Sequence, residues 1–182
     1  LSYTAPHDPL MAWEEDIEKY KDRYRDGYEA IRKQRFEKQK NLGVLPKKTV
    51  LSKAAHVDWD LLSEEEKKSE SRTMAVYAAM IDRLDQNIGR LLNKLEKQGK
   101  LNNTLILFTS DNGGSGEVVN IRGGTGAIGA LSNWKSLGEN WANVSNTPYR
   151  EYKNWSHEGG IKTPLIAYWP NKTKNTGEVV HK

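Results

Sequence analysis

The pattern of apolar and polar positions predicts two amphipathic helices. From residue 13 to about residue 40, apolar side chains recur every three or four positions, which is the period of one helix face. The residues of this face are Ile17, Tyr20, Tyr24, Tyr28 and Ile31. Gly27 is a candidate interruption of this helix, and the breakers Gly43 and Pro46 end it.

The second helix is predicted over residues 63–98. Ser63 is a favourable N-cap with Glu66 three positions on, which is the spacing of a capping box. Gly99 is a favourable stop after the last turn. The apolar face of this helix comprises Met74, Tyr77, Ala78, Ile81, Leu84, Ile88, Leu91, Leu92 and Leu95.

Two short apolar runs predict β-strands. Residues 105–108 form a continuous apolar run of strand length, the pattern of a strand that is covered on both faces. Residues 164–170, with the sequence PLIAYWP, form a second candidate that is closed by proline. A long helix followed closely by a buried strand indicates an α/β fold with a mostly parallel sheet.

Two segments without periodicity are predicted as loops. Residues 1–12 carry two prolines on either side of His7, which favours an extended loop. Residues 113–147 are rich in Gly, Asn and Ser, which indicates a long loop of the active-site type or a disordered segment. Within it, the stretch GGTGAIGA at 123–130 lacks the Lys and Ser/Thr of a phosphate-binding P-loop.

Composition and charge narrow the class of protein. The chain has 182 residues, a net charge of +4 and no cysteine, so disulfides, thiolate metal sites and Cys nucleophiles are excluded within it. Positive and negative residues interleave, so we expect no nucleic-acid partner. No apolar stretch reaches the roughly 18 residues of a membrane span. The opening LSYTAPH, without Met, is typical of the end of an inner strand and indicates a piece of a longer protein.

Two of the six tryptophans lie in the long Gly-rich loop. Trp134 and Trp141 could stack on a sugar or aryl ring of a substrate, or they could anchor the core. Of these two interpretations, the core is favoured. The loop has no pattern that indicates which substrate the protein would take.

Polar residues directly after the first predicted strand are candidate metal ligands. The strand at 105–108 runs into Asp111 and Asn112, and ligand groups in open α/β sheets gather at the carboxyl ends of strands. A carboxylate beside an amide offers two hard oxygens, which suits Ca²⁺ or Mg²⁺. The sequence Asp-Asn-Gly-Gly is equally typical of a tight turn, so both interpretations stay open.

Two cationic or titratable residues could act on an anionic substrate. His7 could donate a proton to a leaving group or bind an anion, although a lone His is more often a surface or capping residue. Lys153, in the segment YREYKNWSHEGGIKTP, could neutralise a negative charge, although a Lys in such a loop is usually solvated.

Three segments, taken in order, resemble the sulfatase family, and arylsulfatases most closely. They are YTAPHDPL, TLILFTSDNG and YKNWSHEGGIKTPLIAYWP. The helix that leads into the second segment also resembles the helix that precedes the family's metal-binding strand. The combination of APH-x-P, SDNG and K-x4-EGG-x3-P-x5-P is far more specific than SDNG alone.

The resemblance implies roles for individual residues. Asp111 and Asn112 match the family's second pair of calcium ligands. His7 matches the His that contacts the sulfate ester near its leaving-group oxygen, and Lys153 matches the Lys that binds the sulfate oxygens. His157 stands where relatives vary and is a candidate substrate contact. A cation and a Lys would stabilise charge on the peripheral oxygens, and a His would act on the bridging oxygen.

The family's nucleophile is expected outside this chain. Formylglycine is made from Cys or Ser in a C/S-x-P/A-x-R motif, and that motif is absent, as are the first Asp-Asp metal pair and the Arg, Lys and His beside the nucleophile. Residues 1–182 are therefore expected to be a partial sulfatase catalytic domain, without the amino-terminal part and the carboxy-terminal subdomain. The implied fold is a three-layer αβα arrangement with a mostly parallel (mixed) sheet, incomplete at the amino-terminal side.

The implied function is hydrolysis of a small-molecule or glycan sulfate ester with Ca²⁺ as cofactor, in a periplasmic or secreted protein. The isolated chain is expected to be inactive, because two ligands fall short of the six or more that Ca²⁺ prefers. Two alternatives stay open. One is a phosphatase or phosphodiesterase of the related alkaline-phosphatase superfamily, although His is scarce near Asp111. The other is a non-catalytic module that binds sulfated glycans.

Overall fold

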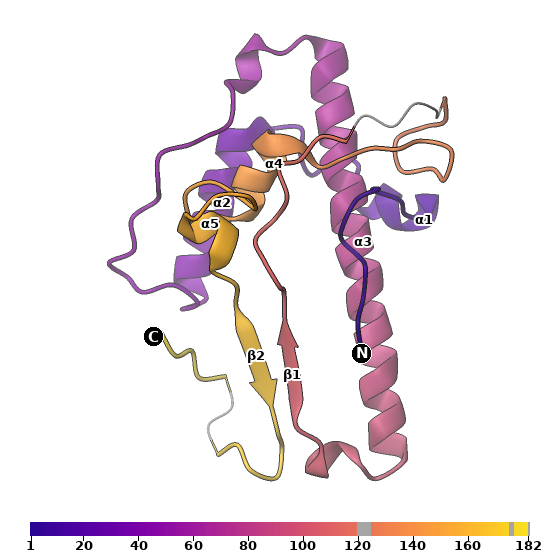
Figure 1. The fold of residues 1–182 in the computed structure, drawn as a ribbon, viewed down its shortest axis with the longest axis vertical. Coiled ribbons are helices and arrows are strands. Elements are labelled where there is room, and N and C mark those ends of the chain that lie inside the picture. Colours follow the sequence, from indigo (N-terminus) through magenta and orange to yellow (C-terminus); the bar gives the residue numbers. More distant parts are fainter. Residues whose placement is uncertain (120–124, 175–176, 182) are drawn as a thin grey trace.

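The computed structural model of the chain describes residues 1–119, 125–174 and 177–181. Figure 1 shows a body of helices from which two strands extend alongside the lower half of a long helix. The elements in chain order are α1 Glu14–Ile17, η1 Glu18–Tyr20, α2 Gly27–Asn41, η2 Trp59–Leu61, α3 Glu64–Lys97, η3 Leu101–Asn103, β1 Ile106–Thr109, α4 Gly138–Ser145, α5 Glu158–Ile161 and β2 Leu165–Tyr168. Helix α1 packs on α3, and α2 packs on α4.

The long helix α3 follows the sequence prediction closely. The Ser63 hydroxyl accepts a hydrogen bond from the Glu66 backbone N–H, and the Glu66 carboxylate accepts one from the Ser63 N–H at 2.8 Å. This reciprocal capping box satisfies two backbone donors that the first turn would otherwise leave unpaired. Gly99 adopts a φ of +67° directly after the helix, as expected of a C-terminal stop. The predicted start, stop and capping box are confirmed.

Only the amino-terminal half of the apolar face of α3 is buried. Met74 and Met80 belong to the core, whereas Ile81 and Leu91, further along the same helix, are exposed. Helix α1, η1 and the core side chains of α4 pack on the amino-terminal half of α3, whereas the apolar side chains at 84, 88, 92 and 95 are only partly buried. The predicted face is therefore present along the helix, but it is only half used as core.

The first predicted helix is broken at the glycine that the sequence singled out. Gly27 has a φ of +82°, and a Cβ placed there would lie 2.3 Å from Cγ of Trp59. Both the left-handed backbone and the close approach of the indole require glycine. The chain therefore forms α1, η1 and a turn before α2 begins. The predicted apolar stripe still faces the core, with Ile17, Tyr24 and Tyr28 buried.

Aromatic side chains join α2, α3 and α4. The rings of Tyr28 and Trp141 meet edge to face, with centroids 4.7 Å apart. The Tyr28 hydroxyl donates to the Glu70 carboxylate at 2.9 Å, and the Trp141 indole N–H donates to the Glu70 carbonyl at 2.9 Å. Burial raises the pKa of the Tyr28 hydroxyl, with the Glu70 carboxylate adding to the effect. Trp141 is fully buried, which confirms its assignment to the core, while Trp134 is only partly buried.

The prediction of a structureless loop over 113–147 is wrong at 138–145, where α4 forms. Its local sequence, GENWANVS, contains a glycine and two asparagines, which are poor helix formers. The helix is stabilised instead by tertiary packing, because Trp141, Ala142 and Val144 all enter the core. In the Gly-rich stretch 123–130, residues 123 and 124 lie outside the described residues.

The sheet differs from the mostly parallel arrangement that was expected. Among the described residues it has two strands, β1 and β2, which pair antiparallel with Ile106 opposite Tyr168 and Thr109 opposite Leu165. Leu107 and Leu165 are 59% and 62% exposed, so the expected cover on both faces is not supplied by the described part of the chain. The α/β character stands, but the described residues do not form a three-layer, mostly parallel sheet.

The amino-terminal segment is more compact than the extended loop that its prolines predicted. The His7 backbone N–H donates to the Thr4 carbonyl at 2.9 Å, which closes a turn around Pro6. Leu10 is fully buried, and its N–H donates to the Lys135 carbonyl at 2.9 Å. Local hydrogen bonding and burial thus hold His7 on a short turn tied to the body. Among the described residues, no helix is long and apolar enough to cross a membrane.

Candidate active site

Antiparallel pairing of β1 with β2 brings two of the predicted site segments together. Because Thr109 at the end of β1 faces Leu165 at the start of β2, the residues that follow β1 lie beside those that precede β2. The Thr109 hydroxyl donates to the Pro164 carbonyl at 3.1 Å across this junction. The Asp-Asn-Gly-Gly segment after β1 therefore meets the segment of Lys153, which precedes β2.

Backbone hydrogen bonds hold these two segments against each other. The Gly113 N–H donates to the Gly160 carbonyl at 3.0 Å, and the Lys153 N–H donates to the Gly114 carbonyl at 3.0 Å. Asn146, just after α4, adds a third contact, because its side-chain oxygen accepts from the Gly114 N–H at 2.8 Å. Asp111 and Asn112 are therefore carried on a segment whose next residues pair directly with that of Lys153.

The amino-terminal turn adds His7 to this site. Nε2 of His7 lies 3.5 Å from Nζ of Lys153, although 146 positions separate the two residues. Nδ1 of His7 lies 3.1 Å from the carbonyl oxygen of Asp8. Since a carbonyl only accepts, Nδ1 of His7 donates to Asp8, and Nε2 is the ring nitrogen that faces Lys153. The structure thus brings His7 and Lys153 into one cluster at the protein surface.

Asp111 and Asn112 have the chemistry of a partial metal site. The Asp111 side chain is exposed and makes no hydrogen bond within the described part of the chain. The Asn112 amide nitrogen donates to the Gly113 carbonyl at 2.8 Å, which leaves its oxygen available as a ligand. A carboxylate and an amide oxygen fit Ca²⁺, but they supply two of its six to eight ligands. Within residues 1–119, 125–174 and 177–181, no group of three or more His, Cys, Asp or Glu could hold a metal ion.

Glu117 is a site residue that sequence reasoning missed. Its carboxylate accepts from the Asn154 side chain at 3.0 Å and lies 4.0 Å from Nζ of Lys153. The Asn154 hydrogen bond and the Lys153 charge hold the pKa of the Glu117 carboxyl below its usual range. No periodicity marks an acid within a Gly-rich loop. The available signal was its position a few residues after Ser-Asp-Asn-Gly-Gly.

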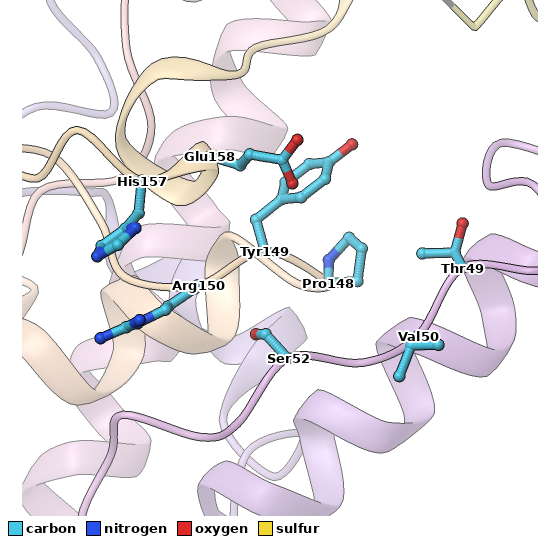
Figure 2. A pocket seen from close by; sticks show the side chains of 8 residues that line it. All are labelled: Thr49, Val50, Ser52, Pro148, Tyr149, Arg150, His157 and Glu158. Carbon is cyan, nitrogen blue, oxygen red and sulfur yellow. The ribbon is translucent and has the colours of Figure 1, made fainter.

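Within the described residues, His157 makes no hydrogen bond with His7 or Lys153. It lines a pocket of about 260 Å³, shown in Figure 2. In this view the imidazole of His157 and the guanidinium of Arg150 lie on the same side of the pocket. The lining residues are Thr49, Val50, Ser52, Pro148, Tyr149, Arg150, His157 and Glu158. The ring of His157 also stacks on Trp155, with centroids 6.3 Å apart.

Two adjacent glycines give a matched test of the packing between the site segments. A Cβ at Gly113 would lie 1.7 Å from the Gly159 carbonyl oxygen, whereas the nearest atom to a Cβ at Gly114 would be 3.5 Å away. We expect Gly113→Ala to lower the free energy of unfolding by about 1–3 kcal/mol, because the backbone at Gly159 must move to make room for the methyl group. Gly114→Ala should change it by less than about 0.5 kcal/mol. Urea denaturation of both variants measures the difference, and equal effects would contradict this packing.

The chain is similar to known proteins over most of its length. A family model described as Sulfatase matches residues 1–182. An uncharacterized sulfatase of Schizosaccharomyces pombe is 39% identical over 189 residues, which cover 93% of this chain and 34% of that protein. An arylsulfatase of Klebsiella aerogenes is 36% identical over 188 residues, which cover 96% of this chain and 40% of that protein.

A third relative has a higher sequence identity over a shorter aligned segment. An N-acetylglucosamine-6-O-sulfatase of Bacteroides thetaiotaomicron is 58% identical over 40 residues, which cover 22% of this chain and 7% of that protein. The chain spans only 34% and 40% of the length of the relatives from Schizosaccharomyces pombe and Klebsiella aerogenes, respectively.

Proposed function

The chain belongs to the sulfatase family, and from this premise we propose that it is part of the catalytic domain of a sulfuric ester hydrolase. The proposed enzyme is of the arylsulfatase type and cleaves a small-molecule or glycan sulfate ester. The names of two relatives, an arylsulfatase and an N-acetylglucosamine-6-O-sulfatase, correspond to these two substrate classes.

The observation that carries the proposal is the meeting of three distant segments at one surface site. His7 and Lys153 approach to 3.5 Å, and the Lys153 backbone pairs with Gly114, two residues beyond Asn112. In sulfate ester hydrolysis, the bond between sulfur and the leaving-group oxygen breaks, and negative charge develops on that oxygen and on the peripheral oxygens. A site that combines an ammonium, an imidazole and two oxygen ligands for a cation suits this charge distribution.

Each residue then has a proposed role. Lys153 binds the peripheral sulfate oxygens, and His7 hydrogen-bonds or protonates the bridging oxygen. Asp111 and Asn112 would hold Ca²⁺, which when bound polarises the sulfate oxygens as a Lewis acid. His157, in its pocket beside Arg150, would contact a part of the substrate away from the sulfate group.

The remaining parts of the site are proposed to lie outside residues 1–182. The nucleophile would be the formylglycine that the family resemblance implies, and it would lie outside this chain, which contains neither Cys nor a Ser in the C/S-x-P/A-x-R motif. Further calcium ligands and the neighbouring strands of a three-layer αβα domain would complete the site and cover β1 and β2. The chain would thus be a partial catalytic domain, and the whole protein would be periplasmic or secreted.

Two other functions remain candidates. A phosphatase or phosphodiesterase of the same superfamily would hold two zinc ions by Asp and His clusters. A non-catalytic module would bind sulfated glycans at the cluster of His7 and Lys153 without cleaving them. The approach of His7 to Lys153 at 3.5 Å, beside a two-oxygen ligand pair, favours the sulfatase.

One comparison of substrates and proteins tests the proposal. The full-length enzyme with calcium should hydrolyse 4-nitrophenyl sulfate steadily, and 4-nitrophenyl phosphate at less than about one hundredth of that rate. The purified 182-residue chain should hydrolyse neither, because two ligands are too few for Ca²⁺ and the nucleophile is elsewhere. Steady sulfate turnover by the 182-residue chain would refute the partial-site proposal. Preference for the phosphate would favour the phosphatase, and sulfate binding without turnover by the full-length protein would favour the binding module.

A further inference from the structure

We propose that Glu117 is an internal counter-ion for Lys153, which the sulfate group of the substrate must displace. This inference rests on the proposed function and names a residue that competes with the substrate at the same site. Oε2 of Glu117 lies 4.0 Å from Nζ of Lys153, on the ammonium that also contacts His7. In the free protein, the charge of Lys153 is thus already matched by a carboxylate.

The position of Glu117 is fixed by the backbone packing of the residues that precede it. Gly116, the preceding residue, is buried against Tyr152, and a Cβ there would lie 2.4 Å from the Tyr152 ring. Ser115 forms a backbone bridge with Lys153. The segment before Glu117 is therefore packed directly on the segment before Asn154, so the carboxylate is built into the site.

Asn154 holds the carboxylate in place from the other side. Its amide nitrogen donates to Oε1 of Glu117 at 3.0 Å, which leaves Oε2 turned toward Lys153. Asn154 has a φ of +84°, a left-handed backbone that is uncommon outside glycine and that Asn tolerates better than most residues. This conformation places the side chain of the residue after Lys153 on the same carboxylate that Lys153 faces.

The arrangement has a direct consequence for anion binding. The Lys153 and Glu117 side chains are 26% and 44% exposed, so an anion from solvent can reach the pair. A sulfate oxygen that binds Nζ of Lys153 would lie near the Glu117 carboxylate. The negative charges of the sulfate and of the carboxylate would then repel each other. Sulfate must therefore push Glu117 aside or bind beside it at a cost in affinity. Such competition would favour release of inorganic sulfate after hydrolysis.

The test is the affinity of the full-length enzyme for inorganic sulfate, measured by calorimetry and as a competitive inhibition constant. Glu117→Gln keeps the shape and the oxygen that accepts from Asn154 but removes the charge. We expect it to bind sulfate about three- to tenfold more tightly, with a similar fall in KM for 4-nitrophenyl sulfate. The gain should shrink as salt rises, because salt screens the repulsion.

Two further variants make the test specific. Glu96→Gln removes the same charge from an exposed position near the end of α3 and should leave sulfate affinity within about twofold of the wild type. Asn154→Gly frees the Glu117 carboxylate, tolerates the left-handed backbone, and should also tighten sulfate binding. Unchanged or weaker sulfate binding in both Glu117→Gln and Asn154→Gly would overturn the inference. Lys153→Ala then separates this inference from the proposed function. If Lys153→Ala abolishes sulfate binding, Lys153 still binds sulfate and the proposed function survives. If sulfate binding is unchanged in Lys153→Ala, the proposed function fails as well.

Discussion

Lys153→Ala should lower kcat/KM for 4-nitrophenyl sulfate in the full-length enzyme by about 10²- to 10³-fold. A positioned charge that meets the transition state contributes about this factor in other enzymes. In this structure the Lys153 ammonium is preorganised, since the backbone of Lys153 pairs with Gly114 and its Nζ contacts His7. Lys153→Arg keeps the charge but replaces a compact ammonium by a planar guanidinium, so we expect its kcat/KM to lie between those of Lys153→Ala and the wild type. Steady-state kinetics on the three proteins measure the effect.

A lysine in the same segment provides the control for this substitution. Lys162 lies at the end of α5, and its ammonium pairs with Glu158 at 3.3 Å. Lys162→Ala removes one positive charge from the neighbourhood and should change kcat/KM by less than about threefold, as for a surface ion pair. If both alanine variants lowered kcat/KM equally, Lys153 would act only through net charge, and its assigned contact with sulfate would be wrong.

Asp111→Asn should weaken calcium binding to the full-length enzyme and reduce activity about 100-fold or more at limiting calcium. The substitution keeps an oxygen at the same position but removes its charge, and the charge count of the ligands tunes calcium affinity. Activity should return in part at high calcium, because the ligand geometry is retained. Calorimetric titration with Ca²⁺ gives the change in affinity independently of turnover.

The matched control removes an aspartate charge away from the site. Asp85 is exposed on α3 and makes no hydrogen bond or ion pair with the described residues, so Asp85→Asn should leave calcium affinity unchanged. A calcium titration of Asp111→Asn that overlays the wild type would show that this carboxylate forms part of a turn and holds no metal. The turn interpretation of Asp-Asn-Gly-Gly would then be correct.

The long helix and the break at Gly27 were predictable because their causes are local. A capping box links Ser63 with Glu66, three residues away, and an apolar stripe repeats within one or two turns. Gly27 has a left-handed φ, and the freedom to adopt such a φ is a property of glycine in any context. Short-range signals of this kind are complete within a few residues. The candidate site residues were also visible as residue types, and the family resemblance added their proposed roles.

Other features depend on contacts between residues far apart in the chain. Helix α4 forms in a poor helix sequence because Trp141 enters a core built by α2 and α3. The direction of the sheet depends on which strand pairs with β1, and here it is β2, whose residues lie 56 to 62 positions further along the chain than their partners.

By itself, the sequence determined the long helix α3, the interruption at Gly27, the two strands, and the chemistry available at His7, Asp111 and Lys153. Only the tertiary structure decided that the His7 turn meets Lys153 and that Glu117 stands beside them. The physical reason is that caps, turns and periodicity act between near neighbours, whereas a site for a small anion is made where distant backbones pair. The antiparallel junction of β1 and β2 and the close glycine contacts create that meeting point, and no local pattern encodes it.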